Sequence, residues 1–145
     1  MQLCTWHRFE ALVNDNLRWL RSNPDFAAVL APYEQGLEHL LTSQTNPERL
    51  KDVITDVYEA LEALAKIFTG RNRDLSANRE RFISELRLPE GYSRILKEYI
   101  NYACDYRHGE DASQRRENPN PREVESFLYL TGVFIRLAIQ PTESA

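Results

Sequence analysis

The chain has 145 residues, of which 42% are hydrophobic and 28% are charged, and its formal net charge is −4. This length fits one domain better than two, and the acidic balance excludes a generally basic nucleic-acid binder. No apolar run approaches a membrane span, and acidic residues interrupt the N-terminal stretch where a signal peptide needs an apolar core. We therefore expect a cytoplasmic protein with one domain and a frayed tail at 141–145.

Several signatures of cofactor and metal sites are absent from the sequence. It contains no Gly-rich phosphate loop, no zinc-type spacing of Cys and His, and no His-Glu-x-x-His helix. Cys4 and Cys104 lie a full chain apart and form no redox motif, so we expect buried free thiols. His7 and His39 lie in amphipathic segments, where surface or boundary positions are more common than ligand roles. The sequence thus predicts no cofactor and no bound metal.

Hydrophobic residues repeat with helical spacing in six segments, which predicts an all-α, single-domain bundle of about six helices. The predicted helices cover residues 5–21, 24–43, 47–69, 75–87, 90–107 and 121–139. Asn-Pro pairs at 23–24, 46–47 and 120–121 favour helix starts, and Glu123 completes a capping box with Asn120. Pro32 should kink or split the second helix, and Gly70 should cap the third.

The last two predicted helices carry the apolar residues that bear on assembly. The fifth helix has a predicted buried stripe of Tyr92, Ile95, Leu96, Tyr99, Ile100 and Ala103. The sixth is apolar on several sides over residues 127–134, so it is either central in the bundle or in contact with a second subunit. We predict a homodimer formed largely by these two helices.

Residues 71–97 form a basic segment within an acidic chain, and most of its basic residues are arginines. The planar guanidinium fork of Arg suits phosphate. Solvated arginines on helix faces are the commoner explanation of such a segment. The alternative is a substrate-binding role toward RNA, for which the candidates are Arg71, Arg73, Arg79, Arg81 and Tyr106.

One dense polar cluster lies at the end of the predicted fifth helix, just before the polar segment 108–120, which should form an exposed loop. Arg107 and His108 occupy the last turn, and Gly109 would end the helix. Arg and His often occupy a last turn because they favour the negative end of the helix dipole, so spacing alone indicates a structural role.

The segment DYRHGED, together with EALEALAKIFTGRNRDLS at residues 59–76, resembles the signature region of HEPN domains, and the abortive-infection (Abi-C-like) branch is most similar. The resemblance covers about residues 47–140 and leaves 1–45 as an N-terminal helical extension packed on that part. It implies a helical bundle that commonly dimerises. Active members cleave RNA without metal, and others bind nucleotides or partner proteins.

Within this resemblance Arg107 matches the motif arginine and His108 the polar residue beside it, whereas Ala112, Ser113 and Gln114 stand where a second histidine is expected. The first hypothesis is a metal-independent RNase of toxin–antitoxin or antiviral phage-defence type. Arg107 would bind the scissile phosphate and His108 would act as acid and base. A dimer would bring two such turns together.

The second hypothesis is a catalytically silent, dimerising module that binds RNA, nucleotide or a partner protein, such as an antitoxin or an effector. The missing histidine favours the module, and the retained Arg-His pair favours the RNase, which we place slightly ahead. If the helix continues through both Arg107 and His108, their side chains diverge by about 100°, which is awkward for a shared substrate.

Overall fold

The computed structural model describes the backbone of residues 2–108 and 119–139, and the side chains of residues 10–104 and 119–139. These parts form six α-helices and one 3-10 helix and contain no strand, which confirms the predicted all-α fold. The elements are α1 (Gln2–Ser22), η1 (Pro24–Phe26), α2 (Ala27–Thr42), α3 (Arg49–Thr69), α4 (Leu75–Leu86), α5 (Glu90–His108) and α6 (Pro121–Ile139).

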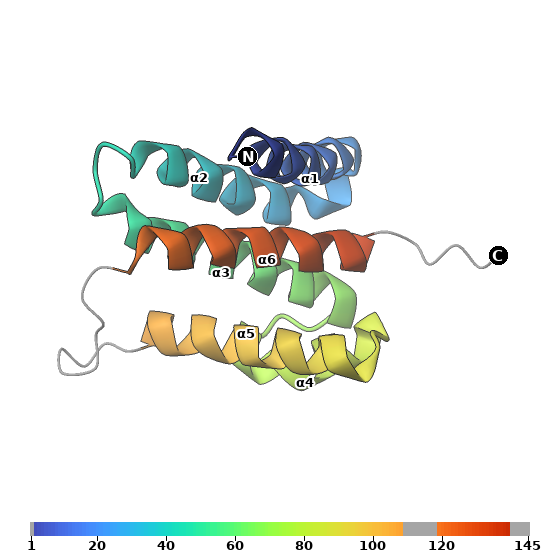
Figure 1. Ribbon diagram of the computed structural model, residues 1–145. Helices are drawn as coiled ribbons and strands as arrows, with labels where there is room; N and C mark the ends of the chain where they lie inside the picture. The colour runs from blue at the N-terminus through green and yellow to red at the C-terminus, as the bar shows by residue number, and fades with distance from the viewer. Residues whose placement is uncertain (1, 109–118, 140–145) are drawn as a thin grey trace.

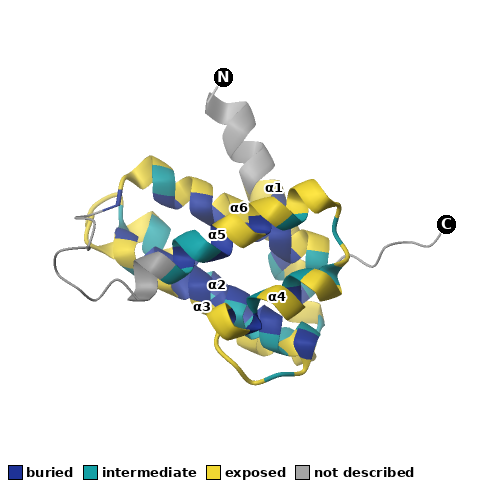
Figure 2. Ribbon diagram, turned by 90° about the horizontal axis from the view of Figure 1, so that it is seen from below, coloured by how far each residue is buried: buried dark blue, intermediate teal, exposed yellow. Residues whose placement is uncertain are grey.

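Helix α6 lies between α2 on one side and α5 on the other, with α3 behind it (Figure 1). Helix α3 packs against α2, α4 and α6, and α1 packs against α2 and α6. The core is centred on α3, whose apolar stripe is buried along its whole length. Figure 2 shows buried residues on the sides of the helices that face one another. Burial of these amphipathic faces supplies most of the stability of such a bundle.

Local signals set three helix boundaries at the predicted positions, one helix end and two helix starts. Gly70 adopts the left-handed conformation at φ 67°, and its N–H donates to the carbonyl of Lys66 at 2.9 Å, which confirms the predicted cap. The Asp74 side chain accepts from the N–H of Ala77 at 2.8 Å and starts α4. The Asn120 side chain accepts from the N–H of Arg122 at 2.9 Å, so it caps α6.

The starts of the second and third helices differ from the prediction. Pro24 begins a 3-10 turn and α2 follows at Ala27, because the Asn23 side chain caps the preceding helix and donates to the carbonyl of Trp19 at 2.7 Å. Helix α3 begins at Arg49, two residues after Pro47. Pro32 does not split α2, because fully buried neighbours on either side of it anchor the helix.

A hydrogen bond between a side chain of α1 and the backbone of α6 ties these two helices together. The buried side-chain amide of Asn16 donates to the carbonyl of Gly132 at 2.9 Å. A Cβ on Gly132 would lie 3.1 Å from the hydroxyl oxygen of Tyr33, which is closer than nine in ten real Cβ contacts. The missing side chain therefore lets α1, α2 and α6 meet closely at this point.

Candidate functional site

Aromatic rings fill the space between α5 and α6. The ring of Tyr99 on α5 stacks on that of Phe127 on α6, with centroids 4.5 Å apart. The ring of Tyr102 also packs against Phe127, with centroids 5.3 Å apart, and that of Phe134 packs against Tyr99 at 5.7 Å. Such large side chains hold two helix backbones farther apart than aliphatic residues do.

A groove follows from this spacing. It has a volume of about 520 Å³ and runs along the surface between the two helices. Its lining consists of Arg94, Ile95, Glu98, Tyr99, Tyr102, Glu123, Ser126, Phe127 and Leu130. Most of the lining surface is apolar, so the groove suits an apolar side chain rather than a charged ligand.

Exposed apolar residues extend the groove on both helices, and they correct the predicted buried stripe of α5. Leu96, Tyr99, Ile100 and Ala103 are buried as predicted, whereas Tyr92 is 51% and Ile95 is 49% exposed. Leu130 and Leu137 on α6 are also exposed. The prediction was wrong for Tyr92 and Ile95 because, among the residues that the structure describes, no other element covers these two side chains. We call Tyr92, Ile95, Leu130 and Leu137 the apolar rim.

Two hydroxyl groups connect α5 to α6 beneath the apolar rim. The Tyr102 hydroxyl donates to Oε1 of Glu123 at 2.5 Å. The Tyr99 hydroxyl contacts Oγ1 of Thr131, which in turn donates to the carbonyl of Phe127. Burial raises the pKa of Tyr99, and the nearby Tyr33 and Tyr102 add to this effect, so the phenol stays neutral and remains a structural contact.

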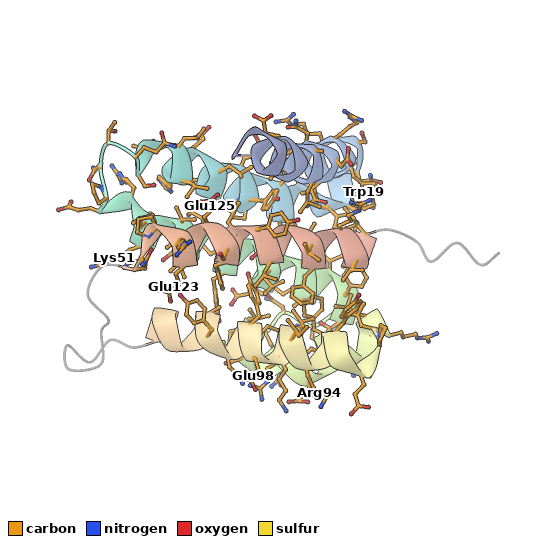
Figure 3. All side chains as sticks on the ribbon, viewed as in Figure 1. Trp19, Lys51, Arg94, Glu98, Glu123 and Glu125 are labelled. Carbon is orange, nitrogen blue, oxygen red and sulfur yellow. The ribbon has the colours of Figure 1, made fainter. Side chains whose placement is uncertain are left out.

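Two opposite charges lie along one edge of α5, where Figure 3 labels them. Arg94 and Glu98 are one helical turn apart, and both are exposed. Neither has an ion-pair partner among the residues whose side chains the structure describes. They therefore give the groove a charged margin of both signs.

The Arg107-His108 pair lies at the C-terminal end of α5, which includes both residues. The helix is therefore one residue longer than predicted, and the two positions differ by about 100° around its axis. The side chains of Arg107, His108 and the candidate substrate residue Tyr106 lie outside those that the structure describes. Tyr106 follows Tyr102 by one helical turn, in the same series of positions as Tyr99.

The candidate phosphate-binding arginines lie on α4 and in the connection that precedes it. Arg79 on α4 donates to the Asn101 side chain on α5 and to Glu80 at 3.1 Å, so it connects two helices. Arg81 lies 3.8 Å from Glu85 on the same helix. Arg71 and Arg73 lie in the connection between α3 and α4, where Arg73 is exposed. The guanidinium groups of Arg79 and Arg81 therefore already have partners within the bundle.

A partly buried pair of ionisable residues joins α2 to α3, and sequence reasoning missed it. His39 Nδ1 lies 2.5 Å from Oδ2 of Asp56. Burial raises the pKa of Asp56, the contact with His39 lowers it, and the carboxylates of Glu59 and Asp52 raise it again, which leaves it above its ordinary value. The one available signal in the sequence was that Asp56 is a charged residue within the apolar stripe of α3. Nothing in the sequence indicates that His39 is the partner of Asp56.

The described residues contain no group of three or more His, Cys, Asp or Glu residues placed to hold a metal ion. None of their helices combines the length and the apolar character needed to cross a membrane. Comparison of the chain with models of known protein families, with curated proteins and with solved structures gives no match.

Proposed function

We propose that the chain is a dimerising interaction module that works through the groove between α5 and α6, consistent with the HEPN-like module resemblance. The observation that carries this proposal is the apolar rim, of which exposed Ile95 on α5 and exposed Leu130 on α6 both line a mostly apolar groove. An exposed apolar patch bordered by polar residues is typical of a protein-binding surface. The aromatic floor is fixed by packing and by hydroxyl contacts, so a partner would meet a preformed surface.

The test places a charge in the centre of the groove. Ile95→Arg should convert a dimer into a monomer of 16.9 kDa, as measured by light scattering over a concentration series. Leu41→Arg is the matched control, because Leu41 is 66% exposed on α2, away from the groove. A wild-type chain that stays monomeric at high micromolar concentration overturns this function, as does a dimer that Ile95→Arg leaves intact.

The second candidate function is metal-independent RNA cleavage at Arg107 and His108. The sequence motif favours RNA cleavage. We rank it behind the interaction module because both residues lie within α5, and consecutive helical positions do not converge on one phosphate. If the chain is an RNase, Arg107→Ala should lower the rate about 100- to 1000-fold. His108→Ala should lower it about 100- to 10000-fold.

The cleavage assay uses total RNA in EDTA, with circular dichroism to check that each variant is folded. Arg21→Ala serves as a surface control, because Arg21 is an exposed arginine on α1 with no assigned role in RNA binding. Cleavage by the wild type that persists in both folded variants contradicts the assigned roles. No cleavage by the wild type removes this second candidate and leaves the interaction module standing.

A further inference from the structure

We propose that the groove takes a second copy of this chain with the two α5 helices antiparallel, and that Arg94 and Glu98 set this direction. This inference rests on the proposed function, which requires only that the groove binds a partner copy. The direction comes from the charges beside the apolar rim, and it decides how far apart the two Arg107-His108 ends lie.

The order of the charges distinguishes the two possible directions. Consider a two-fold dimer whose axis is perpendicular to α5 at the level of residue 96. The two α5 helices then run antiparallel, and Arg94 of each copy faces Glu98 of the other. An axis along α5 would make the helices parallel. Each charge would then face its own equivalent, and two pairs of like charges would repel. Only the antiparallel arrangement gives two attractive pairs.

The apolar residues fit the same register. Ile95 lies beside the axis, so the two copies of this side chain can pack against each other. Tyr92 lies about 6 Å along the helix from residue 96, which sets it level with residue 100 of the second copy. That level is the part of the groove between Tyr99 and Tyr102. Each exposed Tyr92 would thus enter the groove of the other copy.

The antiparallel direction separates the two ends of α5. Residue 107 lies about 16 Å along the helix from the axis, so the two Arg107-His108 pairs would be on the order of 30 Å apart along the helices. This differs from the sequence-based expectation that dimerisation brings the two turns together. The two Arg107-His108 pairs would then not form a composite site, and any activity would come from each pair separately.

Charge reversal tests the direction. Arg94→Glu alone and Glu98→Arg alone each turn two attractive pairs into two repulsive ones, so each should raise the dimer dissociation constant roughly ten-fold at low salt. The double variant R94E/E98R restores opposite charges across the interface and should dimerise like the wild type. High salt should reduce all these differences. Arg49→Glu on α3 is the matched control, since it reverses an exposed arginine away from the groove.

The outcomes separate this inference from the proposed function. Weakening by each single reversal and rescue by the double variant support the antiparallel dimer. In a parallel dimer the wild type, each single variant and the double variant all place like charges together, so equal dissociation constants overturn the proposed direction. The interaction module survives that result if Ile95→Arg still breaks the dimer. A wild-type monomer overturns both proposals.

Discussion

The joint between α2 and α3 and the joint between α5 and α6 are built in opposite ways. At the first, Gly36 lets two backbones approach, and a Cβ there would lie 3.3 Å from Cγ2 of Val57. At the second, stacked rings such as Tyr99 and Phe127 hold the helices apart. The first joint leaves little for another molecule to contact, whereas the second leaves a groove. Residue size at the crossing thus separates the part that stabilises the fold from the part that can bind.

The largest expected difference is between two leucines on α6. Leu128 is fully buried toward Gly36, and Leu128→Ala should lower the free energy of unfolding by about 2–5 kcal/mol, because it leaves a cavity in the core. Leu130, two residues later, is 39% exposed, so Leu130→Ala should change the free energy of unfolding by less than about 0.5 kcal/mol. Urea denaturation at low protein concentration measures both. Equal losses would show that the two joints are packed alike.

A smaller effect is expected from a methyl group at the close joint. Gly36→Ala should lower the free energy of unfolding by about 1 kcal/mol, since crowding against Val57 and Asp56 outweighs the better helix propensity of Ala. Gly91→Ala in α5 is the control, because a Cβ there meets nothing within 4 Å. It should stabilise the chain slightly. Thermal unfolding of both variants shows whether each substitution stabilises or destabilises the chain. A stabilising Gly36→Ala would mean that α2 and α3 can move apart enough to accept the methyl group.

The smallest expected effect concerns pH at the same joint. The folded-state pKa of Asp56 is raised above its ordinary value of 3.8, so the folded chain holds this proton to higher pH than the unfolded chain does. Its contribution to stability is therefore fully present below pH 3.8 and is lost as the pH rises through the folded-state pKa. The melting temperature of the wild type relative to Asp56→Asn should fall over that range. A constant difference would show that Asp56 titrates alike in both states.

Periodicity and caps predicted the helices of this chain well, because both depend on neighbours along the sequence. Gly70 and Asn120 are the clearest examples, since each acts on its own helix end. The same periodicity identified Tyr92 and Ile95 as apolar but could not tell whether another element covers them. Coverage depends on how far apart α5 and α6 lie, which the rings of Tyr99 and Phe127 determine only once the helices have packed.

The candidate site was predictable only in part for the same reason. The sequence placed Arg107 and His108 at a helix end, where the structure also has them. The dimer surface on the last two helices stays a prediction. It could not show that Arg79 contacts Asn101, which is 22 residues away. Nor could it pair His39 with Asp56, because two residues on separate helices carry no common spacing. Contacts across helices depend on register and crossing angle, which local patterns do not encode.

The bond between Asn16 and Gly132 has a consequence for synthesis of the chain. These residues are 116 positions apart, so at ribosomal rates roughly 6 to 23 seconds separate their addition. During that interval α1 and α3 lack the helix that covers part of their apolar faces, since α6 is the last described helix to be made. The nascent chain therefore has an incomplete core during this interval, and the apolar faces that α6 later covers are open to a molecular chaperone.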